Sequence, residues 1–587
     1  MTRRKPGISA IALGAVVALT ATGCGGGGGG APTPAAISVT SPGPAKAGGT
    51  LYYLTNQPAD HLDPQRTYIA RDISNQIRTL YRTLTSFPVA SGKAGTKLVA
   101  DLATDTGSAS DGAKTWKFTL KGGVTWQDGS DITCADLKYG VSRAFATTVI
   151  TGATSSAPQF LDIPADPKGG SLYKGPYVND PAGQSLYDKA VTCDNKTITF
   201  RLSKPVADFN YVVARPAFAP YKADQDKGDK SNFTVFSSGP YQLQGTWTKG
   251  QGGTLVRNPN WNPDTDSIRK ALPDKIEFIE GLTDVTIAQR LILNQLNDQF
   301  AVTDRSIPAE LRPNVNVNPA MSVRSESVDS PLVDYLAPNF TKMTNPLVRQ
   351  ALALCTDKSG WVAANGGASA GKAAQSVISP SVPGYTPSDV FNVPDSGDPS
   401  RSRALLAQAG VKVPYPIAYS YVGDSPAIAR SAAALKAGWE AGGFSVTLND
   451  LTDASYAALQ NPANANKYDL TSASWAAGWP SASSVIPPLF DSRANLSPTS
   501  NGTDYGYYRD DVVNKAIDAA YAMLDPGAAA QMWAGIDKTL AKDVAYIPLS
   551  TRKLFLAWGS GITGWVDNPA VNGYPDLASV GVAVPAN

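Results

Sequence analysis

Histidine and cysteine are scarce in this chain. Its 587 residues include one histidine, His61, and four cysteines. A zinc site needs several histidine, cysteine or carboxylate ligands, and general-base catalysis most often uses a histidine. The sequence therefore predicts no metal site, no cofactor and no catalytic histidine. A glycosidase that uses two carboxylates stays open on inventory alone, because aspartate and glutamate are present.

An excess of basic charge is missing as well. Lysine and arginine number 51, aspartate and glutamate number 49, and the formal net charge is +2. Nucleic-acid binding is favoured by a strongly basic surface, which this balance does not provide. We expect no nucleic-acid partner. Charged residues make up only 17% of the chain, and the 53 glycines and 44 prolines indicate a loop-rich protein.

The N-terminus has the pattern of a secretory signal. Residues 3–5 are basic, residues 8–21 form an uncharged and mostly apolar run, and small residues precede Cys24. The run is shorter than the about 20 apolar residues of a membrane-spanning helix, and its flanks are typical of a signal peptide. Residues 21–24, Ala-Thr-Gly-Cys, resemble a bacterial lipobox, in which Cys24 would carry the lipid. An ordinary signal peptide with an incidental cysteine is the alternative.

The segment after Cys24 predicts a flexible tether. Residues 25–30 are all glycine, and alanine, proline, threonine and serine are common from there to about residue 48. Such a segment cannot bury apolar surface, and a Gly-rich coil of about 24 residues spans roughly 27 Å. No later segment is long and apolar enough to cross a bilayer. We therefore expect a lipid-anchored protein at the extracellular face of the cell membrane.

Three cysteines remain in the body of the chain. Cys134 and Cys193 both lie in the N-terminal third, and a cysteine pair outside the cell is usually oxidised. We predict a disulfide between them. Cys355 shares a helical stripe with Val348 and Leu352, which favours a buried free thiol.

The body, residues 49–587, is too long for one compact core and predicts two or three lobes. Apolar and polar residues alternate at 116–120 and at 198–202, as in half-buried strands. Thr133, followed three residues later by Asp136, predicts the start of a helix.

The second half predicts strand, helix and strand at residues 417–422, 425–441 and 444–448. This alternation implies a parallel sheet with crossover helices. The expected fold class is α/β with mixed sheets.

Seven segments of the body, in this order, resemble the extracellular solute-binding proteins of family 5, which serve oligopeptide and dipeptide ABC importers, in their actinobacterial form. Each segment alone is a weak signal, but together they cover nearly the whole body. They are residues 48–51 with 62–64, 98–103, 116–139, 238–241, 257–261, 274–278 and 348–353. At Cys134 the family usually has alanine, which supports the predicted disulfide.

The resemblance implies an α/β, two-lobed periplasmic-binding-protein-like (Venus flytrap) fold with an extra subdomain in lobe I. Two crossing segments would form the hinge, and the lobes would close on a ligand by rigid-body rotation. The implied parts are a signal peptide at 1–23, a lipidated tether at 24–48, lobe I at 49–90, 230–325 and 545–587, the inserted subdomain at 91–229, and lobe II at 326–544.

The resemblance also places the ligand. Family members carry a Gly-Trp-x-x-Asp-Tyr type of segment in the cleft, and residues 474–479 match it as Ser-Trp-Ala-Ala-Gly-Trp. Trp475 and the backbone of Ser474 and Ala476 would contact the ligand. In oligopeptide binders the aspartate pairs with the α-ammonium group, but this chain has Gly478 there. A buried ammonium without a partner is costly, so the usual mode of peptide binding is in doubt.

Aromatic residues are further candidates for the site. Trp479 and Tyr505 could stack on an apolar or sugar-like ligand, and Tyr68 lies on an early loop. Large aromatics are also common in cores, so a core role is the alternative for each. Asp504 or Asp491 could replace the missing acid.

Residues 366–372 contain two motifs of enzymes. The match to G-x-S-x-G at 367–371 lacks a preceding strand and a downstream histidine. The match to G-x-x-x-x-G-K is followed by Ala373 instead of the Ser or Thr that would bind Mg²⁺. We interpret the segment as a Gly/Ala-rich loop and predict that the chain is not an enzyme.

The sequence thus predicts a monomeric binding protein that captures peptides between its lobes and delivers them to an ABC permease. A non-peptide ligand, such as an oligosaccharide or a modified or siderophore-like compound, is the alternative because of Gly478. An exported hydrolase is a remote alternative.

Overall fold

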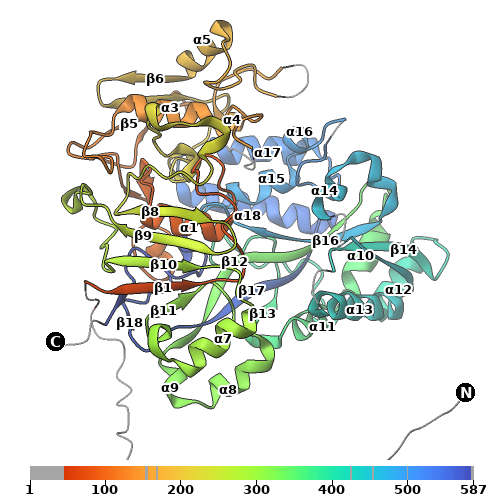
Figure 1. Ribbon diagram of the computed structural model, residues 1–587. Helices are drawn as coiled ribbons and strands as arrows, with labels where there is room; N and C mark the ends of the chain where they lie inside the picture. The colour runs from red at the N-terminus through yellow and green to blue at the C-terminus, as the bar shows by residue number, and fades with distance from the viewer. Residues whose placement is uncertain are drawn as a thin grey trace, which may run out of the picture. The chain divides into compact units, whose positions relative to one another are not determined.

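The computed structural model describes residue 45 and residues 47–151, 157–166, 170–423, 426–451, 455–498 and 500–583. The predicted signal peptide, the lipobox and nearly all of the tether lie outside these residues. The body has mixed α/β structure built on sheets of five, six and four strands, with two further strand pairs (Figure 1).

The five-stranded sheet has the strand order β11-β1-β10-β9-β8. β1 pairs in parallel with β10 and β11, and the remaining pairs are antiparallel. Leu51 and Tyr53 of this sheet share a buried core with Leu80 and Tyr81, which follow α1 (Ala70–Thr79). The strands are β1 (Thr50–Leu54), β8 (Tyr241–Thr248), β9 (Gly252–Arg257), β10 (Lys275–Ile279) and β11 (Ala301–Thr303).

The four-stranded sheet has the order β4-β5-β7-β6. Trp116 and Phe118 on β5 and Ile198 and Phe200 on β7 are buried, whereas the residues between them are more exposed, as the alternation predicts. The strands are β4 (Ser108–Ser110), β5 (Thr115–Thr119), β6 (Val191–Asp194) and β7 (Thr197–Arg201).

Helix α3 (Cys134–Arg143) packs beside this sheet and begins where the sequence predicts. The Thr133 hydroxyl accepts a hydrogen bond from the backbone N–H of Asp136, whose carboxylate accepts one from the N–H of Thr133. This capping box satisfies two backbone donors at the helix start. A disulfide joins Cys134 of α3 to Cys193 of β6, the pair predicted from the sequence.

The six-stranded sheet has the order β13-β17-β12-β16-β14-β15. β14 pairs in parallel with β15 and β16, and α13 (Pro426–Ala441) connects β14 to β15, as the strand–helix–strand pattern predicts. Cys355 is a buried free cysteine in the core beneath this sheet. The strands are β12 (Ser325–Pro338), β13 (Gly371–Ala373), β14 (Tyr415–Tyr421), β15 (Phe444–Asp450), β16 (Leu470–Ala476) and β17 (Ile547–Ala557).

The longest strands of this sheet, β12 and β17, run antiparallel and reach the five-stranded sheet. Ser325 pairs with Ala557, and just beyond it the N–H of Gly559 donates to the carbonyl of Ala301 in β11. We assigned residues 545–587 to lobe I from the sequence, but 547–557 lie in the six-stranded sheet. Two strands therefore connect the sheets, and they are the natural candidates for the predicted hinge.

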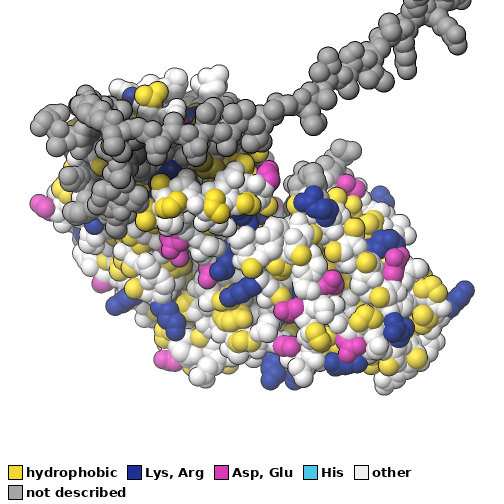
Figure 2. Space-filling model, turned by 90° about the horizontal axis from the view of Figure 1, so that it is seen from below, with side chains coloured by type: hydrophobic (Ala, Val, Ile, Leu, Met, Phe, Trp, Pro, Cys, Tyr) yellow, Lys and Arg dark blue, Asp and Glu magenta, His cyan; other side chains and the backbone are white. Residues whose placement is uncertain are grey.

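The other helices of eight or more residues are α5 (Pro181–Ala190), α7 (Asp284–Leu293), α10 (Pro346–Leu354), α12 (Pro399–Gln408), α17 (Asp511–Tyr521) and α18 (Pro526–Asp543). In the described residues, no helix combines the length and the apolar character needed to cross a membrane. On the face shown in Figure 2, lysine and arginine side chains are interspersed with acidic ones, in keeping with the nearly balanced net charge.

Candidate ligand-binding site

A cavity of about 570 Å³ lies where three distant parts of the chain meet. Ile73 and Ile77 come from α1, and Tyr211 and Arg215 come from the segment around α6 (Phe209–Val212). The loop at 477–480, which follows β16, forms much of the wall. Residue 331, residues 381–382 and residues within 569–572 also line the cavity. Most of the residues that line it are apolar, with a few polar side chains among them, as is usual for small-molecule sites.

Gly478 and Arg215 meet at this cavity. Nη1 of Arg215 donates a hydrogen bond of 3.2 Å to the carbonyl oxygen of Gly478. A Cβ atom at position 478 would lie 2.4 Å from Nη1, so a side chain there would require the guanidinium to move. No carboxylate among the described residues forms an ion pair with Arg215, and burial lowers its pKa because the charged form is desolvated.

Trp479 lines the same cavity and is held from behind. Its indole N–H donates to the Asp208 carboxylate at 3.2 Å and to the Ser483 hydroxyl at 3.0 Å. Asp208 also accepts a hydrogen bond from Ser483. The side chain is 8% exposed and its ring lies edge-on to that of Phe160. Trp479 is therefore a fixed part of the wall.

The structure places the other predicted contacts of this segment on β16, beside the cavity but outside its lining. The Ser474 hydroxyl donates to Asp334 at 2.5 Å and accepts from Arg552 at 2.9 Å. The Trp475 indole N–H donates to the carbonyl of Ser484 at 2.9 Å. With Ala476, these residues end the strand that positions the loop at 477–480.

Asp334, which sequence reasoning missed, is the centre of that framework. It is 3% exposed. Its two oxygens share the Nε–H of Arg552 at 2.9 and 3.0 Å, Oδ1 also accepts from Nη2 at 2.6 Å, and Oδ2 accepts from Ser550 at 2.7 Å. Burial alone would raise the pKa of Asp334, but the adjacent guanidinium and the hydrogen bonds outweigh this and lower it. The pair ties β12 to β17 and β16.

The remaining candidates lie away from the cavity lining. Tyr505 is buried in the core, and Tyr68 is 45% exposed, with its ring 6.3 Å from that of His61. Asp491 is paired with Arg493, and Asp504 is buried elsewhere. Neither acid replaces the missing carboxylate at the cavity.

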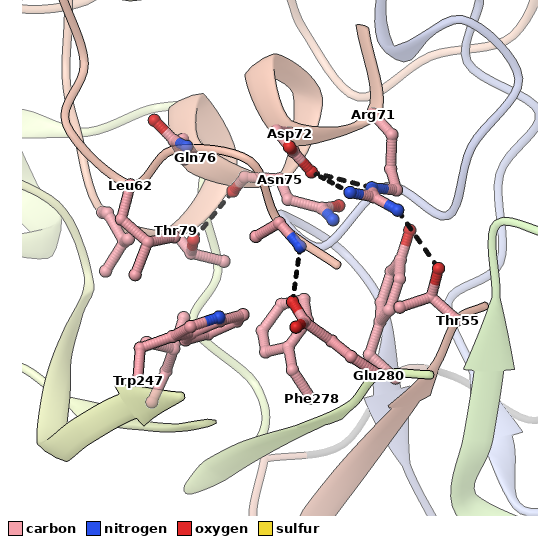
Figure 3. A pocket seen from close by; sticks show the side chains of 14 residues that line it. Thr55, Leu62, Arg71, Asp72, Asn75, Gln76, Thr79, Trp247, Phe278 and Glu280 are labelled. Atoms are coloured by element: carbon pink, nitrogen blue, oxygen red, sulfur yellow. Dashed lines mark hydrogen bonds and ion pairs between the residues drawn. The ribbon is translucent and has the colours of Figure 1, made fainter. Parts of the chain in front are cut away.

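A second cavity of about 380 Å³ lies between α1 and the five-stranded sheet (Figure 3). Its charged groups have partners within the protein. Arg71 pairs with Asp72 at 2.6 Å and donates to Thr55, and Glu280 accepts from the N–H of Ala59 at 2.6 Å. Burial raises the pKa of Glu280. Because each of these charged groups already has a partner within the protein, we regard the cavity as a structural feature.

The enzyme-like segment, which we predicted as a loop, is a short turn that leads into β13 (Gly371–Ala373). A short 3₁₀ turn at 367–369 follows α11 (Lys358–Ala364), so no strand precedes Ser369, and its hydroxyl accepts from Arg312. The described part of the chain also contains no group of three or more His, Cys, Asp or Glu residues able to hold a metal.

The architecture of these mixed sheets is that of a periplasmic binding protein, as comparison with solved structures shows. The solved structure titled "Clavulanic acid biosynthesis oligopeptide binding protein 2" is 27% identical, covers 93% of this chain and all of its own, and superposes with a TM-score of 0.84. The probable D,D-dipeptide-binding periplasmic protein DdpA of Escherichia coli K12 is 24% identical over 86% of this chain and 90% of its own length. The glutathione-binding protein GsiB of Salmonella choleraesuis is 26% identical over 78% and 82%.

The family model described as "Bacterial extracellular solute-binding proteins, family 5 Middle" matches residues 97–497. This chain belongs to that family. Its relatives named above are binding proteins and not enzymes.

Proposed function

We propose that this chain is the extracellular substrate-binding protein of an ABC importer and that it captures peptides in the cavity beside Gly478. The observation that carries the proposal is the lining itself, which combines residues of lobe I, the inserted subdomain and lobe II as we assign them. A ligand there would touch all three parts at once. Relatives named for dipeptide and glutathione binding support the ligand class.

Closure follows from the connections between the sheets. β12 and β17 are the strands that pass between them, so a rotation about these strands would open and shut the cavity. A ligand that binds better to the closed form shifts the equilibrium toward it. The permease would then recognise the closed form of a monomer, held at the outer face of the membrane by the lipid on Cys24.

A non-peptide or modified ligand is the second candidate. It is favoured because none of the described residues that line the cavity is acidic, so a free α-ammonium group would find no carboxylate among them. Oligosaccharides and modified or siderophore-like compounds belong to this class.

Native mass spectrometry of the purified protein tests the proposal directly. We expect a co-purified small molecule that is lost on mild unfolding, and a rise in melting temperature when it is added back. Turnover of the molecule, or the absence of any reversible ligand, would contradict the proposal. Lipid attachment is tested separately, because Cys24→Ala should abolish labelling with a fatty-acid analogue and release the protein from the membrane fraction.

A further inference from the structure

Arg215 is the only charged side chain among the residues that line the 570 Å³ cavity in the described structure. A guanidinium carries five N–H donors. One bond, to the carbonyl of Gly478, is present in the described structure, and Nε and Nη2 have no acceptor there. The cavity therefore presents a positive group with most of its donors still available.

Two buried arginines elsewhere in the chain are satisfied by the protein. Arg71 has Asp72 as its partner, in the cavity shown in Figure 3. Arg324 has no carboxylate partner among the described residues, but donates to the carbonyls of Leu291, Trp558 and Ile292. Arg215 is half-buried and has a single carbonyl as its acceptor in the described residues, so more of its donors stay available than in either of these. Burial lowers its pKa because the charged form is desolvated.

Asp208, which holds Trp479 from outside the cavity lining, already accepts hydrogen bonds from Trp479 and Ser483. The remaining wall is mostly apolar, with Ile73, Ile77 and Trp479 among its large side chains.

We propose that Arg215 binds an anionic group of the ligand, a carboxylate, and that Gly478 is the residue that admits the guanidinium to the cavity. A planar guanidinium fits a carboxylate with two parallel hydrogen bonds. The inference rests on the proposed function and narrows its substrate class to solutes with a carboxylate, an apolar body and no ammonium near the carboxylate. A peptide would be held through its C-terminal carboxylate, and N-acylated peptides would be favoured.

The test is affinity selection with the purified full-length protein. The probe is an equimolar library of N-acetylated dipeptides with apolar side chains, each present as the free acid and as the C-terminal amide, with free-amine dipeptide amides added. Retained compounds are quantified by mass spectrometry. We expect the wild type to retain acids over their matched amides by about tenfold or more, as for a hydrogen bond to a charged group.

In Arg215→Gln this acid-to-amide ratio should fall to about one, because the guanidinium is removed. In Gly478→Ala the ratio should fall, because the added Cβ displaces Nη1. Arg401→Gln is the matched control, since Arg401 is exposed on α12 and donates only to the carbonyls of Asn392 and Phe391. It should keep the wild-type ratio. Circular dichroism checks that each variant is folded, and Arg215→Gln alone decides the test if Gly478→Ala is not.

Equal retention of acids and amides by the wild type would overturn the inference, and so would an unchanged acid-to-amide ratio in folded Arg215→Gln. Preferred retention of free-amine dipeptide amides would also overturn it. In each of these cases the proposed solute-binding function would still stand. If the wild type retained no member of the library and carried no co-purified molecule, both the inference and the proposed function would fail.

Discussion

Replacing Asp504 by asparagine should make the stability of the protein less sensitive to pH. Asp504 is 2% exposed, and its Oδ1 accepts hydrogen bonds from the backbone N–H groups of Gly506 and Tyr508. Its Oδ2 has no hydrogen-bond partner in the described structure. Burial raises the pKa of Asp504 to about 8, although these hydrogen bonds and the charge of Arg509 act in the opposite direction. The folded protein therefore holds this carboxyl in its neutral form at neutral pH.

The sign of the pH dependence follows from the two pKa values. In the unfolded chain the group has its ordinary pKa of 3.8, so between that value and about 8 the folded state binds a proton that the unfolded state has released. The contribution to stability is complete below pH 3.8 and is lost as the pH rises to about 8. The loss is at most about 1.4 kcal/mol per pH unit, or roughly 3 kcal/mol between pH 5 and pH 7.

Urea denaturation of the wild type and Asp504→Asn, followed by tryptophan fluorescence from pH 5 to pH 8, measures this loss. An asparagine keeps the Oδ1 acceptor and stays neutral. The free energy of unfolding of the variant should therefore rise steadily relative to that of the wild type as the pH increases. Asp111→Asn, which removes an exposed carboxylate, should follow the wild-type curve. If the curves of the wild type and Asp504→Asn ran parallel, Asp504 would be charged in the folded state and the reasoning from burial would be refuted.

Two further predictions concern residues 91–229, which we assign to the inserted subdomain. Replacing Cys134 and Cys193 by alanine opens a link between residues 59 apart, and should lower the free energy of unfolding by about 4 kcal/mol on the chain-entropy model; equal denaturation midpoints for the variant and the oxidised wild type would contradict this. Asp101→Asn leaves Arg82 and Arg269, both buried and paired with Asp101 at 2.8 Å, without that charge. We expect a loss of about 3–5 kcal/mol in the same assay, and a loss below about 1 kcal/mol would show that the remaining hydrogen bonds suffice.

Much of the fold could be predicted because local patterns act at short range. The alternation at 116–120 reports one buried and one exposed face of β5, and the pairing of Thr133 with Asp136 fixes the start of α3 within a single turn. The sheet to which a strand belongs is not local information. β17 has the apolar residues that either sheet requires. Its long pairing with β12 is what assigns it to the six-stranded sheet. That is why we placed its residues in lobe I from the sequence.

The candidate site divides in the same way. The match at 474–479 located the loop that lines the cavity, and Trp479 lies in the wall. The sequence match did not show that the Ser474 hydroxyl contacts a buried carboxylate, because Asp334 and Arg552 come from other strands. Tyr505 and Tyr68 were chosen by residue type, which does not separate a core ring or an exposed ring from one in a cavity.

Arg215 had one local signal. It is the only charged residue in the apolar segment 211–219, and a charged residue is uncommon within such a segment. Its meaning depends on a contact with Gly478, 263 residues away. A Cβ at 478 would lie 2.4 Å from Nη1, so any side chain there would force the guanidinium to move. The position where the resemblance would place an acid is thus the position whose lack of a side chain leaves room for this cation.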